Sequence, residues 1–334
     1  MDHQQSPCEI GLVQAFGMSA SRGPAYLRDF AQATEALGFH SLWMPEHVVF
    51  FEQYQSVYPY PPHPGSSERP TLPVGKRAGL FDPLLACQAA AMHTTTLRVG
   101  TAVALLPLRH PLLWAREVAT LDHFSGGRFE FGIGIGWLAE EFAALNVDFS
   151  TRGRLTDEYL AALHAAWSQE ESTFHGEFVN FTDALSFPKP VQPRPARNQR
   201  APGGPASIEA QRRSTAPVLR PPILIGGEST AALRRVARYG DGWYGWNITP
   251  VQLDAALTQL DMQLAQHQFI DGRIRTRADV FVQVGLRHPG PLDAIAELVQ
   301  SYRDLGAERV VVSVDIATRS FEQQLQHIAD SLGV

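Results

Sequence analysis

The sequence is poor in cysteine. Cys8 and Cys87 are its only two cysteines in 334 residues, and no histidine cluster lies near either one. A disulfide framework is therefore not expected, and the ligand spacing of a zinc site is missing as well. We predict a protein that holds no metal.

Long apolar runs and blocks of one charge sign are also lacking. No stretch approaches the roughly 20 consecutive apolar residues of a membrane-spanning helix. Lys plus Arg number 28 and Asp plus Glu 34, which leaves a formal net charge of −6. This balance predicts neither a nucleic-acid partner nor a membrane partner. We expect a cytoplasmic protein.

A recurrent pattern of helix, glycine and short apolar strand is present instead. Gly38, Gly240 and Gly306 each follow a helical stretch and each precede an apolar segment. Glycine just past a helix end adopts the left-handed conformation without steric cost, so each marks a helix stop. The pattern predicts alternating helices and strands.

Eight such strands can be counted along the chain. They are expected at residues 9–16, 40–44, 97–104, 128–135, 222–225, 242–246, 279–286 and 309–314. Strands with few polar residues suit a parallel sheet that helices cover on both faces. Eight units in one chain predict a single (β/α)8 TIM barrel spanning residues 1–334, with an open doubly wound sheet as the alternative.

Two segments interrupt this rhythm, after strands two and four. Residues 48–80 are rich in aromatic residues and proline and follow the carboxyl end of a strand, so we predict a lid loop. A plain surface excursion is the alternative. Residues 193–221 combine arginine with Pro, Gly, Ser and Ala, which predicts a disordered insertion. Residues 174–185 resemble a hairpin outside the barrel.

The reacting groups of such a barrel lie where its strands end. Strand two ends in Glu46 and His47, and a carboxylate beside an imidazole can act as a general acid or base near neutral pH. A solvated or purely structural pair is the alternative. Strand three ends in small residues, including Ala102 and Val103, against which a flat ring could lie. Ordinary barrel packing would explain them equally well.

Strand four carries glycines at alternate positions. Gly132, Gly134 and Gly136 share one face and are followed by Trp137. Because this face is bare, we expect a bound aromatic cofactor to fill the space. The spacing differs from the dinucleotide-binding G-x-G-x-x-G loop, since the third glycine comes one residue early. Nicotinamide binding through this segment is not expected.

Strand five ends in a turn that could hold a phosphate. Gly226 and Gly227 are followed by Glu228, Ser229 and a helical stretch. Adjacent glycines can turn their N–H groups outward, and a helix start adds partial positive charge. Glu228 would have to point away from such an anion. A simple strand-to-helix connection is the alternative.

Taken in order, these motifs resemble the bacterial luciferase-like monooxygenases, and most closely their coenzyme F420 (deazaflavin) dependent oxidoreductase branch. The resemblance covers nearly the whole chain. It rests on residues 37–43, 46–47, 110–111, 120–122, 125–128, 132–137, 187–190, 222–227 and 238–243.

The resemblance implies a (β/α)8 barrel with a flavin or deazaflavin ring in its mouth. Glu46 and His47 match an acid and histidine pair beside the reactive ring carbon. Ala102 and Val103 match a non-proline cis peptide that supports the ring. Gly226 and Gly227 match the phosphate-binding turn. Some deazaflavin relatives place a glutamate where this chain has Trp137, which is a departure from their pattern.

The resemblance also implies a reaction. We expect hydride transfer between coenzyme F420 and a small organic substrate, with His47 moving a proton and Glu46 assisting it. A monooxygenase that uses reduced flavin mononucleotide (FMN) and dioxygen is the first alternative. A non-catalytic flavin-binding or deazaflavin-binding protein is the second. Barrels of this family often pair, so a homodimer is expected.

Overall fold

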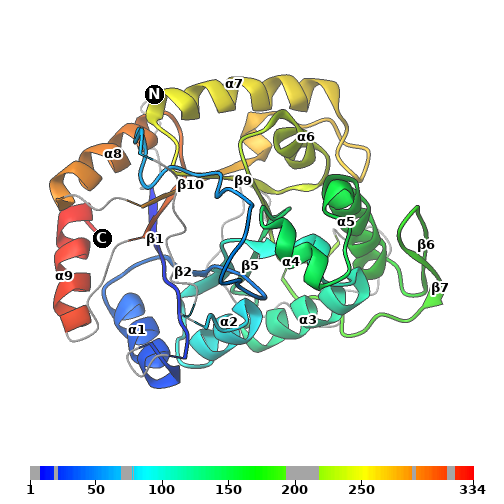
Figure 1. The fold of residues 1–334 in the computed structure, drawn as a ribbon, viewed down its shortest axis with the longest axis horizontal. Coiled ribbons are helices and arrows are strands. Elements are labelled where there is room, and N and C mark those ends of the chain that lie inside the picture. The colour runs from blue at the N-terminus through cyan, green and yellow to red at the C-terminus, as the bar shows by residue number, and fades with distance from the viewer. Residues whose placement is uncertain are drawn as a thin grey trace.

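The computed structural model describes residues 8–18, 22–68, 77, 79–192, 218–287, 291–313 and 320–334. A closed parallel barrel forms its centre (Figure 1). The eight barrel strands are β1 (Glu9–Val13), β2 (Ser41–Met44), β3 (Arg98–Thr101), β5 (Phe129–Gly134), β8 (Ile223–Gly226), β9 (Gly242–Trp246), β10 (Phe281–Arg287) and β11 (Arg309–Ser313). They pair in that order, and β11 returns to β1. The predicted (β/α)8 barrel is confirmed.

Helices surround the barrel on the outside (Figure 1). They are α1 (Pro24–Ala36), α2 (Pro83–Met92), α3 (Pro111–Phe124), α4 (Ala139–Ala144), α5 (Arg152–Ser168), α6 (Thr230–Tyr239), α7 (Pro250–Gln266), α8 (Leu292–Asp304) and α9 (Phe321–Leu332). Four of them begin at a proline, whose missing N–H would have no partner in the first turn anyway. Apolar side chains from these helices and from the strands form one continuous core.

The glycines after the helices have two different roles. Gly38 and Gly306 have φ angles of 85° and 93°, as expected for left-handed helix ends. Gly240 was expected to do the same but has an extended backbone, with φ of −83°. A Cβ atom at Gly240 would lie 2.8 Å from Ile225, so the close approach of β8 requires glycine here.

The third predicted strand is divided in two. Residues 97–104 were expected as one run, but β3 ends at Thr101 and β4 (Ala104–Leu105) follows it. The peptide bond between Ala102 and Val103 is cis, which confirms the bond that the family resemblance implies. Both short strands pair with β5, so the barrel stays closed.

The two interruptions lie after β2 and after β5, the fourth strand of the barrel. After β5 the chain forms α4, α5 and the antiparallel hairpin of β6 (Ser172–His175) and β7 (Asn180–Ala184), which confirms the predicted hairpin. The hairpin projects from the side of the barrel (Figure 1). Of the predicted disordered insertion, residues 193–217 lie outside the described residues. Arg220, near its end, is buried and donates hydrogen bonds to both carboxylate oxygens of Asp241.

Buried ionic groups join the strands at their amino-terminal ends. Arg309 donates to Glu130 at 2.7 Å and to Glu9 at 2.9 Å, and Arg98 also donates to Glu130. These cations hold the pKa of the Glu130 carboxyl well below its usual range despite burial. This end of the barrel is closed, so the opening lies at the carboxyl ends of the strands.

Candidate active site

A cavity of about 880 Å³ lies at the carboxyl ends of the barrel strands. The predicted site residues all line it, from the ends of four different strands. They are Glu46, His47, Ala102, Val103, Gly134, Gly136, Trp137, Gly226, Gly227, Glu228 and Ser229. Pockets of this size hold cofactors and drug-sized ligands in other proteins. The sequence therefore located one site, although the role of each residue stays a prediction.

The carboxylate that holds His47 is Glu141, in the first turn of α4. Nδ1 of His47 lies 3.0 Å from Oε2 of Glu141. The other carboxylate oxygen, Oε1, accepts the N–H of Val48 at 2.6 Å and the N–H of Val49 at 3.2 Å. Glu141 is fully buried, so water does not compete for these bonds. The ring is thereby fixed at the barrel mouth.

Glu46 bonds to other groups than His47 among the described residues, and its assistance in proton transfer stays a prediction. Its Oε2 accepts the N–H of Leu105 at 2.5 Å, and Arg109 lies 3.5 Å from its Oε1. The carboxyl thus connects the end of β2 to β4. Burial raises the pKa of Glu46 to about 7, while Leu105 and Arg109 oppose that shift. Adjacent side chains at a strand end point in different directions, which explains why Glu46 and His47 have different partners.

The glycine face of β5 is covered by protein atoms, which corrects the expectation that it is bare. A Cβ at Gly132 would meet the carbonyl oxygen of Thr101 at 2.0 Å, and one at Gly134 would meet Val103 at 2.6 Å. A Cβ at Gly136 would lie 2.6 Å from the ring of Phe142. The glycines therefore admit close neighbours. Val103 is the side chain that they place against the cavity.

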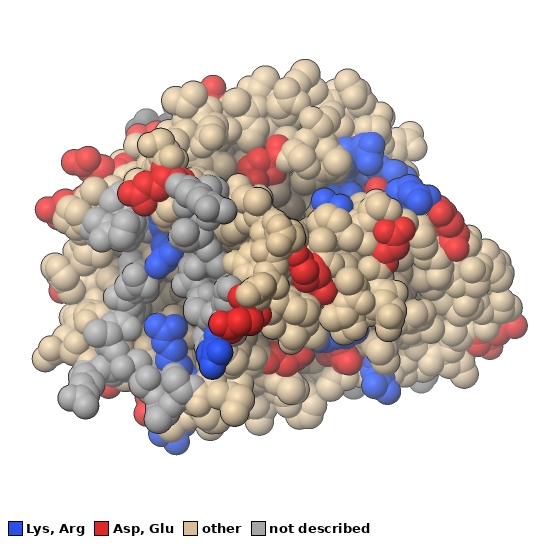
Figure 2. All heavy atoms as spheres, in the orientation of Figure 1, with Lys and Arg blue, Asp and Glu red and all other residues tan. Residues whose placement is uncertain are grey.

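The turn after β8 has the features of an anion site. Gly227 has a φ angle of 109°, and the hydroxyl of Ser229 accepts the N–H of Ala232 at the start of α6. Arg152 at the start of α5 lines the same cavity. Its Nε is buried and has no hydrogen-bond partner among the described residues. Figure 2 shows Lys and Arg side chains gathered over the region of α5 and α6.

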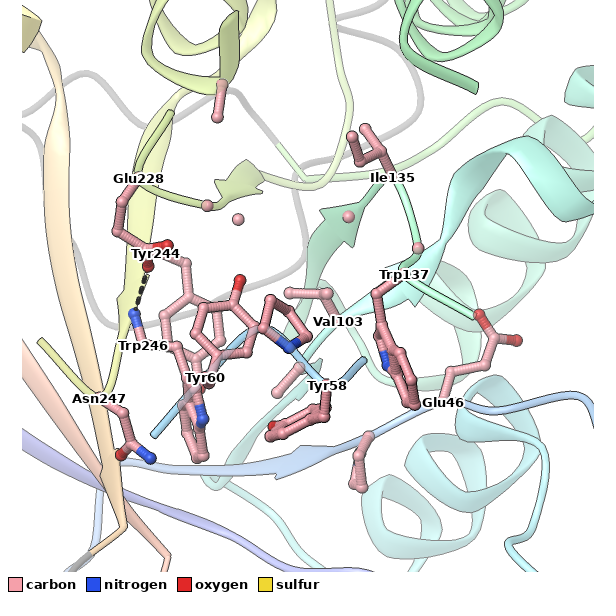
Figure 3. A pocket seen from close by; sticks show the side chains of 18 of the residues that line it. Glu46, Tyr58, Tyr60, Val103, Ile135, Trp137, Glu228, Tyr244, Trp246 and Asn247 are labelled. Carbon is pink, nitrogen blue, oxygen red and sulfur yellow. Dashed lines mark hydrogen bonds between the residues drawn. The ribbon is translucent and has the colours of Figure 1, made fainter. Parts of the chain in front are cut away.

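Glu228 points toward the cavity rather than toward α6. Its Oε1 accepts the N–H of Trp246 at 2.9 Å, and the side chain lies beside Tyr244 (Figure 3). Burial raises the pKa of Glu228 to about 7. The carboxyl group is thus directed away from the helix start, as an anion site at that start requires.

The described part of the predicted lid, residues 48–68, 77 and 79–80, reaches over the cavity. Tyr58 and Tyr60 line it, and the ring centroid of Tyr58 lies 5.3 Å from that of Trp137. Glu140 accepts the N–H groups of Gln55 and Ser56, so α4 holds one side of the segment.

The opposite side of this segment is held from the end of β9. Asn247 donates a hydrogen bond from Nδ2 to the carbonyl oxygen of Pro61 at 2.8 Å. Its Oδ1 accepts the backbone N–H of Arg287 at 2.7 Å. Whether the lid opens and closes stays a prediction.

Three functional residues escaped the sequence reasoning. Glu141 lies 94 residues from His47, Arg152 begins α5, and Asn247 directly follows β9. The consecutive glutamates after Trp137 were a usable signal, because they follow a strand end and begin a short helix. Nothing in the sequence near Arg152 or Asn247 distinguishes them from other polar residues.

The described residues contain neither a group of side chains suited to a metal ion nor a helix suited to a membrane. Among the described residues, no group of three or more His, Cys, Asp or Glu side chains could hold a metal ion. None of the helices in the same part of the chain is both long enough and apolar enough to cross a membrane.

The fold and the cavity define a (β/α)8 barrel with its site at the carboxyl ends of the strands. The sequence model of the luciferase-like monooxygenases matches residues 11–327, so the chain belongs to that family. The family consists of oxidoreductases and monooxygenases, which confirms the resemblance seen in the motifs.

Known relatives use two different cofactors. The chain is 33% identical over 215 residues to the uncharacterized protein Rv0953c of Mycobacterium tuberculosis, across 64% of each chain. It is 31% identical over 166 residues to an FMNH2-dependent dimethylsulfone monooxygenase of Pseudomonas putida, across 48% of this chain and 39% of that enzyme. An F420-dependent secondary alcohol dehydrogenase, solved with an F420-acetone adduct, has the same fold, with a TM-score of 0.69 and 12% identity over 98% and 99% of the two chains. A flavin or deazaflavin cofactor is thus supported.

Proposed function

We propose that the protein transfers a hydride between coenzyme F420 and a small organic substrate. The observation that carries the proposal is that His47, Val103 and the turn at Gly227 all open into one cavity of about 880 Å³. A single flat cofactor with an anionic tail would reach all three. When bound, a deazaflavin supplies or accepts a hydride at a ring carbon.

The residues present fit such a cofactor. Val103 and Ile135 offer an apolar wall for a ring. The start of α6 and the buried, unpaired Nε of Arg152 offer positive charge for a phosphate. Arg235 also lines the cavity, but its guanidinium is already paired with Asp157. We therefore assign Arg152 the main side-chain contact with the tail.

His47 is arranged to move a proton. Nδ1 donates to the carboxylate of Glu141, so the neutral ring carries its lone pair on Nε2. No hydrogen bond within the described residues engages Nε2, and the ring lines the cavity. His47 can therefore accept a proton from a substrate there, and return one in the reverse direction.

A second candidate is an FMNH2-dependent monooxygenase. The similarity to the dimethylsulfone monooxygenase favours it, since that enzyme uses reduced flavin. The same cavity, the same arginine and the same histidine would serve this reaction. The identity of the cofactor decides between the two candidates.

Titration of the cofactor-free protein separates these candidates. We expect coenzyme F420 to bind at least about tenfold more tightly than FMN, a difference of about 1.4 kcal/mol. Protein fluorescence would report binding. Tighter binding of FMN, with oxygen consumption by the reduced form, would support the monooxygenase and contradict our proposal.

Two substitutions test the assigned residues. His47→Ala should leave cofactor affinity nearly intact and slow turnover about a hundredfold or more. Arg152→Met should weaken cofactor binding about tenfold. Arg154→Met is the matched control, because Arg154 pairs with Glu177 at the surface. A non-catalytic binding protein would be indicated if the native chain binds the cofactor without turnover and His47→Ala binds it equally well.

A further inference from the structure

One end of the cavity combines a carboxyl group with a wall of aromatic rings. Glu228 lies there with Tyr244 and Trp246, and Tyr60 reaches toward them from the lid (Figure 3). None of these side chains has a part in the proton transfer or the phosphate contact proposed above. Their chemistry indicates what kind of ligand group this end would hold.

Among the described residues, no side-chain cation forms a salt bridge or hydrogen bond with the carboxyl group of Glu228. Its Oε1 accepts the N–H of Trp246 at 2.9 Å. Among the described residues, only the backbone N–H groups of Trp246 and of Glu228 itself favour its ionised form. Arg287 also lines this cavity, where burial raises the pKa of Tyr58 and the charge of Arg287 opposes that rise. An ionised group that lacks a partner in the protein is costly to bury, so a ligand that supplies a positive charge would be favoured.

The four rings that line this part of the cavity form two contacting pairs. The ring centroids of Tyr58 and Tyr60 are 5.7 Å apart, and those of Tyr244 and Trp246 are 6.2 Å apart. Burial raises the pKa of the Tyr58 and Tyr60 hydroxyl groups, and the nearby charge of Glu228 adds to the rise in both. Aromatic faces attract cations through their quadrupoles and give almost nothing to anions.

Positive groups also line the cavity. Arg152 and the start of α6 are among them, and they suit the anionic tail of a cofactor. A substrate that shares the cavity with that tail is therefore best matched by a positive group at the Glu228 end.

We propose that Glu228, Tyr58, Tyr60, Tyr244 and Trp246 form a substrate subsite for an organic cation, an ammonium or iminium group carried on a small apolar frame. The inference rests on the proposed function, because it names the substrate class for the same cavity. Glu228 supplies the negative charge, and the rings enclose the apolar substituents on nitrogen.

Calorimetric titration of the whole cofactor-free protein tests the subsite without any turnover. The probes are choline, its neutral isostere 3,3-dimethylbutan-1-ol, and the anion 3,3-dimethylbutanoate, which share their shape and differ in charge. We expect choline to bind about tenfold more tightly than the alcohol, and the anion to bind more weakly still.

Two variants assign the effect to residues. Glu228→Gln keeps an oxygen for the N–H of Trp246 and removes the charge, so choline affinity should fall about tenfold and the alcohol should bind as before. Tyr60→Leu keeps the apolar bulk without the ring, and should weaken choline severalfold. Glu171→Gln is the control, because Glu171 is exposed on another part of the chain and lies outside the cavity lining.

The outcomes separate this subsite from the proposed function. Equal binding of choline and the alcohol, or unchanged choline binding in both variants, overturns the subsite even where coenzyme F420 binds and hydride transfer occurs. Choline binding that depends on Glu228 and Tyr60 supports the subsite even where neither coenzyme F420 nor FMN binds. In that second case only the proposed function fails.

Discussion

Replacing Glu141 with glutamine should move the ring hydrogen of neutral His47 from Nδ1 to Nε2. In the native chain Oε1 of Glu141 accepts the N–H groups of Val48 and Val49, and Oε2 lies 3.0 Å from Nδ1 of His47. A glutamine can keep its oxygen toward the two backbone groups. Its NH2 group then faces Nδ1, and an N–H at Nδ1 could not form a hydrogen bond with that second donor. The ring must carry its proton on Nε2 instead.

The size of the effect follows from these contacts. The two backbone bonds survive, and one charge-assisted bond becomes a neutral one, so the free energy of unfolding should fall by only about 1–2 kcal/mol. Turnover should suffer far more. With a hydrogen on Nε2, the ring can no longer accept a proton at the cavity, and proton transfer by such a group is worth about 10²–10⁴ in rate.

Nitrogen NMR of the imidazole distinguishes the two tautomers directly, and steady-state kinetics gives the rate. Glu140→Gln is a matched control on the neighbouring residue, since Glu140 accepts hydrogen bonds from Gln55 and Ser56 and does not contact His47. The reasoning is refuted if Glu141→Gln leaves the proton on Nδ1, or if it slows turnover no more than Glu140→Gln does.

Three other substitutions test the packing and electrostatics around the site. Glu46→Gln removes a carboxyl whose pKa is raised from 4.5 to about 7 in the folded chain, so its stability relative to the native chain should rise by up to about 3 kcal/mol from pH 4.5 to pH 8; a urea-unfolding difference that does not change with pH would contradict this. Gly134→Ala should cost about 1–3 kcal/mol in thermal unfolding, because the new Cβ would lie 2.6 Å from Val103, and Val103→Ala should relieve it. Arg220→Met should lower the free energy of unfolding by about 3–5 kcal/mol, because the buried carboxylate of Asp241 loses the guanidinium that donates to both of its oxygens; an unfolding midpoint equal to that of the native chain would contradict this.

The strands were predictable because their signals are local. Short apolar runs with glycine or proline at their ends depend on neighbouring residues alone, and each of the eight was found within a few residues of its predicted bounds. The division of the third strand was not visible in propensity or pattern. The family resemblance implied the cis peptide between Ala102 and Val103, but the strand around it was still predicted as one run.

The partners of the site residues were less predictable because they are set by contacts distant in sequence. The neighbouring Glu46 was the natural partner for His47, yet the structure supplies Glu141 from the loop after β5. The face of Gly132 and Gly134 was read as empty because nothing in the sequence shows that Thr101 and Val103 lie against it. Periodicity predicts on which face of a strand a side chain lies, but it does not predict which residues pack against that face.

Two glutamates that line one cavity, and a third that holds a lining residue from behind, show how surroundings separate the roles of identical side chains. Glu141 is saturated with hydrogen-bond donors and holds an imidazole ring. Glu46 is buried against Leu105 and Arg109, so its carboxyl connects β2 to β4. Glu228 is half-buried in the cavity lining, where only backbone N–H groups among the described residues favour its charge. Of the three, only Glu228 lacks a described side-chain partner for its carboxyl group. A ligand with a positive charge can supply that partner.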